Sequence, residues 1–496
     1  MVLRAHFALE RIGMGRKLPL IVALMFVSLL AFAQLCGCYL CTCGAGQCAN
    51  GQCARHAVSN AAPPLPPPPC ATKLQSSMLC TAPQVYGTGG LILPNPNHAA
   101  HFASSEANFQ IPLSVSVGTE LSLLSIPSPA SGVLFTYDQT LHTYVPSQES
   151  YGPIVTERAE TIGRHRIFVA TTYQFFDFSS LDGIDLKHLP VVYSHVEFPV
   201  GGQIPAFEHE FITTQNRIDL KAHQTTLVGT FGLTNRIDVS VAVPILDVRL
   251  GITSNATIVR TSPQPVAPTD PLFGSTVDGF YHFFNVNNPA GSVNQTFSNF
   301  KSAFGIGDVV FHIKGTVLKA ERFRVALGLD VRTPTGDAEN FLGSGTPGYK
   351  PFIAASYAGR ISPHANLGFQ YNGQSVLAGN LGTATSGKLP NEFFYSGGVD
   401  IAVKRRLTLA ADLVGTRLSS ATRLRESPFV DIDGVSHPDI PTATLFRDPV
   451  NMIDISTGVK YKPWGNLLLT ANVAFKANDP GLRAKVIPLG GISYSF

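Results

Sequence analysis

From His165 onward the chain consists of strand-like runs separated alternately by short turns and long loops. Five tight turns interleave with six longer loops, which gives twelve strands and puts both ends of the set on the tight-turn side. Bacterial outer-membrane barrels combine an even number of antiparallel strands with short periplasmic turns and long outer loops. The pattern therefore predicts an all-β fold over residues 164–496, a transmembrane antiparallel β-barrel of about 12 strands, within a range of roughly 10–14. The tight turns are expected at 232–236, 319–322, 359–364, 404–406 and 462–466. The long loops are expected at 179–208, 259–306, 335–348, 373–391, 418–450 and 477–485.

The side chains within these runs divide into two faces. In 323–333, Val325 and Leu327 share one face, and Arg324 and Asp330 share the other. Period-2 alternation places an apolar face against lipid and a polar face toward a lumen, although a soluble sandwich of two sheets shows the same pattern. The inward positions that we predict to line the lumen are Asp308, His312, Lys314, Arg324, Asp330, Arg332, Asp400, Asp412, Asp454 and Lys460. These charges either set the solute preference of a channel or pair across the lumen and brace the wall.

Aromatic residues on the outward face gather at two heights, which favours the membrane barrel over the sandwich. Aromatic girdles at both interfaces flank the apolar band of a membrane barrel. The girdle near the tight turns is predicted to contain Phe231, Phe323, Tyr461, Trp464 and Phe496. The girdle near the long loops is predicted to contain Tyr173, Phe175, Tyr371, Tyr395 and Phe475.

Composition agrees with a membrane barrel and argues against a helical membrane protein and a nucleic-acid-binding protein. After the first 33 residues the chain contains no series of apolar runs of about 20 residues, which a helical membrane protein would need. Mean hydropathy is +0.15 while charged residues make up only 14% of the chain, the combination that alternating lipid-facing and lumen-facing residues produce. The formal net charge of +3 indicates no particular partner, and the chain has no basic cluster that would predict nucleic-acid binding.

The first 33 residues have the features of a secretory signal peptide. Arg11, Arg16 and Lys17 precede an uncharged apolar run from 18 to 32, and Ala31-Phe32-Ala33 forms an A-x-A cleavage site. We therefore predict export, with cleavage after Ala33. A membrane-spanning helix and acylation near Cys36 or Cys38 are the alternatives.

Residues 34–80 form a Cys/Pro-rich extension. All eight cysteines of the chain lie between residues 36 and 80, and an even, clustered set in an exported chain favours disulfides over thiolate ligation of a soft metal. Pro63–Pro69 predicts a stiff extended spacer. Residues 81–163 lack regular strand spacing; we expect a periplasmic segment or a lumen plug, with one small hairpin over 111–126.

The last six residues form a two-faced strand that ends on an aromatic residue. Ile492, Tyr494 and Phe496 alternate with small or polar residues. Gly491, Tyr494 and Phe496 resemble the C-terminal signal of bacterial outer-membrane barrels, although Leu489 departs from the polar residue usual upstream. The resemblance implies recognition by the barrel-assembly machinery and insertion among outer-membrane lipids.

Two further stretches resemble a barrel family named for the meta pathway of phenol degradation. Residues 231–238 (Phe-Gly-Leu-Thr-Asn-Arg-Ile-Asp) resemble its periplasmic hairpin. Residues 333–337 (Thr-Pro-Thr-Gly-Asp), followed by 342–345 (Leu-Gly-Ser-Gly), resemble its strand-to-loop motif. The similarity would cover about residues 160–496. The family is described as outer-membrane transporters and is distantly similar to long-chain fatty-acid channels, which implies the passage of small, hydrophobic or aromatic solutes.

The sequence thus predicts a porin-like channel or transporter of the bacterial outer membrane, without a cofactor or a metal site. One alternative is an anchor or adhesin without transport. Another is an outer-membrane hydrolase, but the chain contains neither a Gly-x-Ser-x-Gly elbow nor a His-Glu-x-x-His pair.

Overall fold

The computed structural model describes residues 65–124, 135–138, 143–146, 150–195, 209–261, 265 and 279–496. The predicted signal peptide, and with it the cleavage and acylation alternatives, lies outside the described residues. So do residues 34–64 of the Cys/Pro-rich extension.

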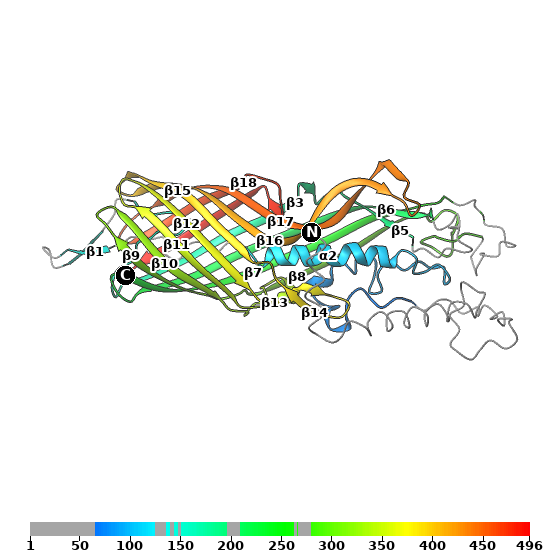
Figure 1. Cartoon of the computed structure of the whole chain (residues 1–496), viewed down its shortest axis with the longest axis horizontal. Coiled ribbons are helices and arrows are strands. Elements are labelled where there is room, and N and C mark those ends of the chain that lie inside the picture. Colours follow the sequence, from blue (N-terminus) through cyan, green and yellow to red (C-terminus); the bar gives the residue numbers. More distant parts are fainter. Residues whose placement is uncertain are drawn as a thin grey trace, which may run out of the picture. The chain divides into compact units, whose positions relative to one another are not determined.

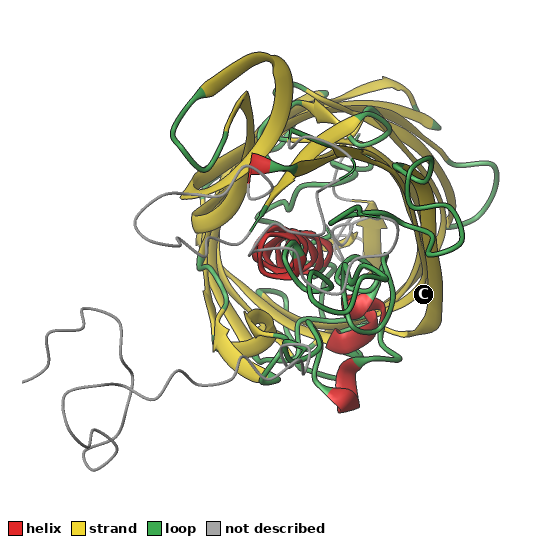
Figure 2. Cartoon of the chain, turned by 90° about the vertical axis from the view of Figure 1, so that its right-hand side faces the viewer, coloured by secondary structure: helices red, strands yellow, loops and turns green. Residues whose placement is uncertain are grey.

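Within the described residues, twelve antiparallel strands close into a barrel, as the sequence predicts (Figure 1; Figure 2). The first strand, β3, pairs with β6 on one side and with the last strand, β20, on the other, which closes the sheet. Two wall strands are interrupted and are each made of two segments, β8 with β9 and β19 with β20. The wall comprises β3 (Ile167–Leu181), β6 (Phe211–Gly232), β7 (Ile237–Val259), β8 (Asn294–Ile306), β9 (Val310–Lys319), β10 (Phe323–Arg332), β11 (Gly348–Tyr357), β12 (Ile361–Asn372), β15 (Glu392–Lys404), β16 (Leu407–Val430), β17 (Ser436–Tyr461), β18 (Leu467–Lys476), β19 (Leu482–Ala484) and β20 (Val486–Ser495).

Shorter elements accompany the wall. Strands β4 and β5 pair with the loop-side ends of β3 and β6, and the hairpins β1–β2 and β13–β14 form separate two-stranded sheets. These elements are β1 (Phe135–Asp138), β2 (Thr143–Pro146), β4 (Ile184–Asp185), β5 (Leu189–Ser194), β13 (Gln374–Asn380), β14 (Thr385–Lys388), the helix α2 (Ala103–Leu121) and the 3-10 helices η1 (Thr72–Leu74), η2 (Met78–Cys80) and η4 (Ala338–Asn340).

Several wall strands are longer than the sequence predicts. The expected loop 418–450 is wrong over most of its length, because β16 and β17 continue through it, and the expected loop 259–306 is wrong over 294–306, which forms β8. Polar residues lie on both faces of β16 and β17 in this region, but the backbone still forms a ladder that pairs Ala421–Pro428 with Pro441–Asp448. In β8 the exposed residues Phe300, Phe304 and Ile306 do alternate with partly buried ones. The tight turn expected at 359–364 ends early, since β12 begins at Ile361.

The outer face of the wall is apolar near the tight turns and carries charged residues nearer the long loops. Near the tight turns, β6 exposes Leu227 and Phe231, whereas further along the same face Arg217 pairs with Asp219 at 2.9 Å. A membrane strand needs only about 9–11 residues to cross the hydrocarbon core, and β6 has 22. The apolar half is therefore the lipid-facing part, and the loop-side half of β6 and β7 projects beyond the membrane.

The expected hairpin at 111–126 is wrong: residues 103–121 form α2. Twelve of its 19 residues are buried, among them Glu106, Gln110 and Glu120. A helix that is buried on most sides carries no clear amphipathic period, so its sequence gives little helical signal. No described helix is both long enough and apolar enough to cross a membrane.

Residues 65–80 pack together with α2. A disulfide joins Cys70 to Cys80, so the expectation of disulfides is confirmed for this pair, while the other six cysteines lie outside the described residues. Leu74, Met78 and Leu79 belong to the same buried apolar cluster as residues of α2, β6 and β7. The boundary drawn at residue 80 therefore does not separate two structural units.

The lipid-facing assignment predicts a cost for a charge on the outer face. Leu327, near the middle of β10, is 52% exposed on that face. Leu327→Arg should destabilise the folded barrel by about 2–4 kcal/mol, the range for a cation at the bilayer midplane. Thr416 lines the lumen cavity, so Thr416→Arg is the control. Reversible unfolding in lipid vesicles measures both, and equal losses would contradict the assignment.

The C-terminal residue should matter for assembly. Phe496 is 59% exposed, its ring stacks edge-on against Tyr494, and its backbone N–H donates to Ile167 O at 2.8 Å across the barrel closure. Phe496→Ala keeps the backbone bond but removes the terminal ring. We expect it to reduce the fraction of heat-modifiable, assembled barrel in cells more than it reduces the stability of barrel already assembled. Unchanged assembly in cells would contradict this.

Candidate functional site: the barrel lumen

Helix α2 lies inside the ring of strands when the barrel is viewed along its length (Figure 2). Its C-terminal half bonds to wall strand β16 and to the hairpin β13–β14: Ser116 Oγ donates to Thr422 O and Thr119 Oγ1 donates to Leu377 O, each at 2.8 Å. The carboxylate of Glu120 accepts from Leu482 N at 2.5 Å. These bonds fix the end of the helix against the inner side of the wall.

Residues 150–163 occupy the other end of the lumen, near the tight turns. Tyr151 OH donates to Arg405 O at 2.6 Å, and Thr161 Oγ1 donates to Asn235 O at 3.1 Å; both acceptors are in tight turns. Ile162 N donates to the buried carboxylate of Asp238 at 2.8 Å. The chain preceding β3 is therefore attached to the inner wall at both ends of the barrel.

Buried ion pairs hold residues 150–163 in place. Lys314 Nζ lies 2.5 Å from Glu157 Oε1, and Arg324 Nη1 lies 3.0 Å from Glu160 Oε1. Lys460 Nζ donates to the carbonyl oxygens of Tyr151 and Pro153. The side chains of Lys314 and Lys460 are almost completely buried. A buried cation requires such partners, because an unpaired charge in a low-dielectric interior is costly.

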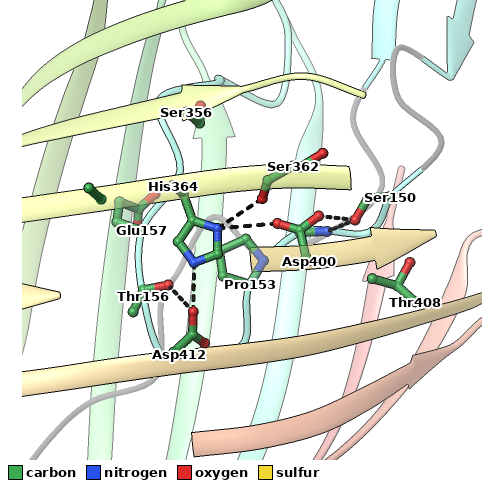
Figure 3. A network of polar contacts seen from close by, with 12 residues as sticks. Ser150, Pro153, Thr156, Glu157, Ser356, Ser362, His364, Asp400, Thr408 and Asp412 are labelled. Carbon is green, nitrogen blue, oxygen red and sulfur yellow. Dashed lines mark hydrogen bonds and ion pairs between the residues drawn. The ribbon is translucent and has the colours of Figure 1, made fainter. Parts of the chain in front are cut away.

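A polar network joins the same segment to three neighbouring wall strands (Figure 3). His364 lies between two carboxylates, with Nε2 2.6 Å from Asp412 Oδ1 and Nδ1 3.3 Å from Asp400 Oδ1. Ser150 donates to Asp400, and Thr156 donates to Asp412 at 3.1 Å. Carboxylates of the wall thus serve as anchors for residues 150–163.

Between these two attached regions lies a cavity of about 300 Å³. All twelve strands of the wall contribute to its lining. The last two residues of α2 and the three that follow, 120–124, border it on the loop side, and Val155 borders it on the tight-turn side. The cavity therefore lies on the barrel axis and is bordered on both sides by the chain preceding β3.

The cavity has an apolar lining and a charged lining. Phe176, Phe178, Leu246, Leu342 and Phe394 are among its apolar residues. Among its charged residues, Asp330 binds both His312 Nδ1 at 2.6 Å and Lys350 Nζ at 2.8 Å. In the described part of the chain, His312 Nε2 and Gln174 Oε1 are buried without a hydrogen-bond partner, although both residues line the cavity. These two atoms are available to a polar group of a bound molecule.

The Gly-rich motif of residues 333–345 is folded around Asp308. The Asp308 carboxylate accepts from Gly336 N at 3.0 Å and from Ser344 N at 2.8 Å. A Cβ at position 343 would lie 2.3 Å from Asp308 Oδ1, which explains the glycine there. Asp308 also lies 3.6 Å from Arg332 Nε, and Arg332 donates to Ser122 O just beyond α2. The motif therefore positions an arginine at the cavity.

The structure places the ten predicted lumen residues in two groups on the inner side. Lys314, Arg324, Asp400, Asp412 and Lys460 bind residues 150–163, and Asp308, His312, Asp330, Arg332 and Asp454 line the cavity. Arg483, not predicted, pairs with Asp454. Glu157, Glu160 and Lys350 were also missed. Lys350 lies in β11 at a position where the alternation of side chains predicts an inward direction, so the sequence could have revealed it. The two glutamates lie outside any helix or strand, where no alternation shows which side chains point inward.

Comparison with known proteins agrees with the motifs. Residues 234–424 match the model of the family described as "Putative MetA-pathway of phenol degradation". The resemblance predicted from the turn and loop motifs is confirmed. The matched range is narrower than the 160–496 expected from sequence, and it contains the Asp308 site with its Gly-rich motif. No curated protein matches the chain.

The solved structures that match the chain are distant from it in sequence. An outer membrane channel from Pseudomonas putida F1 is 11% identical with a TM-score of 0.40, and the alignment covers 68% of this chain and 98% of that one. A FadL homologue from Pseudomonas aeruginosa is 11% identical with a TM-score of 0.27, over 74% and 94% of the two chains. The outer membrane protease OmpT from Escherichia coli is 9% identical with a TM-score of 0.23, over 68% and 99%.

Attachment of α2 should weaken as pH rises. Burial raises the pKa of the Glu120 carboxyl from 4.5 to about 7; nearby Asp182 also raises it, while Leu482 N, Arg483 and Arg423 oppose the shift. A raised pKa means that the bound helix favours the neutral acid. Its stabilising contribution is full below pH 4.5 and is lost as pH rises through about 7.

Limited proteolysis of residues 65–124 in the folded barrel, over a pH series, tests this prediction. Glu120→Gln keeps a neutral side chain at every pH. The wild-type cleavage rate should equal that of Glu120→Gln at the acidic end and exceed it above pH 7. Comparing the two proteins at each pH cancels the pH dependence of the protease. A constant ratio across the series would refute the expected titration.

Proposed function

We propose that the protein is an outer-membrane channel or transporter for small hydrophobic or aromatic solutes that carry a polar group. The observation that carries the proposal is the axial cavity of about 300 Å³, with aromatic and aliphatic residues on one part of its lining and charged residues on another. Such a lining accepts an apolar body and orients it through a few polar contacts. The family match supports the same class of solute.

Passage requires movement of the chain that borders the cavity. A twelve-strand barrel is wider than the eight-strand type that side chains fill, and narrower than an open porin. Residues 120–124 and Val155 lie across the bore on either side of the cavity. We propose that a solute reaches the cavity when α2 or residues 150–163 shift, while the wall stays closed.

The first alternative is an anchor without transport. It is favoured by the extensive bonding of residues 150–163 to the wall, which would suit a permanently filled barrel. Solute flux distinguishes a channel from an anchor, because an anchor would release no solute from vesicles.

The second alternative is a hydrolase, and the polar network of Figure 3 argues against it. A serine nucleophile needs its hydroxyl against the imidazole base. Ser150 instead donates to Asp400, and both ring nitrogens of His364 already face carboxylates. Among the described residues, this arrangement fits attachment of the segment better than acyl transfer.

We further propose that the chain is exported through its N-terminal signal and inserted by the barrel-assembly machinery. The apolar outer face and the terminal strand support insertion among outer-membrane lipids.

Flux into vesicles tests the channel proposal with a matched pair on β16. Val414 lines the cavity, whereas its neighbour Leu413 is 43% exposed on the outer face. Val414→Trp should fill cavity space and strongly reduce uptake of a small phenol into liposomes, while Leu413→Trp should leave uptake unchanged. Heat-modifiable migration verifies that both barrels fold. No uptake by the wild-type protein, or equal uptake by both variants, would refute a route through the cavity.

A further inference from the structure

Four histidines and a glutamate meet on the loop side of the barrel, away from the axial cavity. His98 and His101 precede α2, His195 follows β5, and His282 lies in the connection from β7 to β8. Glu210 directly precedes β6. All five side chains are buried. Segments far apart in the sequence therefore bring their imidazoles to one point.

Two separations between ring nitrogens match those of a tetrahedral metal site. Nitrogens bound to Zn²⁺ at about 2.0–2.1 Å lie about 3.3–3.4 Å apart at the corners of a tetrahedron. His101 Nδ1 lies 3.3 Å from His98 Nδ1 and 3.4 Å from His282 Nε2. The ligand atoms of these three residues all lie within 4.8 Å of one another. His195 Nε2, 2.6 Å from His101 Nδ1, is placed to supply a fourth ligand after a small shift.

The nitrogens of three rings converge on a fourth. His101 Nδ1 lies within 3.4 Å of nitrogens from three other rings. A cation held by neutral imidazoles takes one lone pair from each ring, so its ligand nitrogens lie this close together.

A carboxylate orients one of the imidazoles. Glu210 Oε2 lies 2.6 Å from His282 Nδ1, and both side chains are fully buried. A histidine that binds a metal usually donates its other N–H to a carboxylate or carbonyl, which fixes the ring and raises its basicity. Here the carboxylate holds Nδ1, which leaves Nε2 directed at the other histidines.

We propose that His98, His101 and His282, with His195 as a fourth ligand, bind a divalent transition metal of the imidazole-preferring class, Zn²⁺ in the first instance. Glu210 is a positioning residue. Neutral imidazoles suit Zn²⁺, Cu²⁺ and Ni²⁺ better than Mg²⁺ or Ca²⁺, which prefer oxygen ligands. The ion joins the segment before α2 to the connections that flank β5 and β8. It therefore attaches the N-terminal end of α2 to the wall from outside the membrane. This site is independent of solute transport through the cavity.

Zinc binding by the tag-free, full-length protein in detergent tests the proposal. After equilibration with Zn²⁺ and gel filtration, elemental analysis should find an equimolar amount in the wild type and much less in His101→Ala/His282→Ala. The control His188→Ala/His223→Ala also removes two imidazoles, but at partly or fully exposed positions, and should retain the wild-type amount. Heat-modifiable migration verifies that each barrel folds.

Two further readouts keep the test decisive. Co²⁺ should give the intense visible bands of a tetrahedral site in the wild type and the control, but not in the double variant. Glu210→Gln should retain the site but weaken Zn²⁺ affinity by about 10–100-fold, as expected for loss of a carboxylate that orients a ligand. Equal Zn²⁺ content in wild type and double variant, or a wild type that retains none, would overturn the proposal.

Discussion

The pairing of Lys314 with Glu157 joins the two parts of this molecule. The lysine belongs to the barrel wall and is fully buried, and its partner belongs to the chain inside the lumen. Removing one partner of a buried pair costs about 3–5 kcal/mol, because the remaining charge is left without compensation. Arg324 and Lys460 depend on the same segment. The wall and its contents therefore form one electrostatic unit, not an empty cylinder with an added plug.

This dependence explains where the charges of the inner wall lie. Inward charges toward the tight turns bind residues 150–163, and those further along line the axial cavity. Asp308 connects the Gly-rich motif to the cavity. Its carboxylate binds backbone N–H groups of the motif and positions Arg332 beside the end of α2. At the loop side, the metal site that we propose at the histidine cluster would add a separate attachment of the chain that precedes β3. In the proposed transport, some of the attachments of α2 or of residues 150–163 to the wall must break.

Local sequence pattern predicted the wall but not its contents. The succession of tight turns and long loops predicted the strand count, and alternation in stretches such as 323–333 predicted the lipid-facing side and the inward position of Arg324 and Asp330. Alternation failed for the loop-side part of the hairpin β16–β17, where both faces carry polar residues, and β8 was not recognised as a strand. Helix α2 was missed because it is buried on most sides. Glu157, Glu160 and the histidine cluster depend on contacts between distant segments, which no local period records.

Buried pairs with Glu157 and Glu160 keep residues 150–163 in the bore, and single-channel conductance of the full-length protein in planar bilayers tests this role. Glu157→Gln/Glu160→Gln leaves Lys314 and Arg324 without their carboxylates, so we expect a larger or more frequently open conductance than in the wild type. Asp219→Asn, which alters only an exposed pair on the outer face, should behave as the wild type. An unchanged conductance from a correctly folded double variant would show that the two glutamates do not hold the segment in the bore.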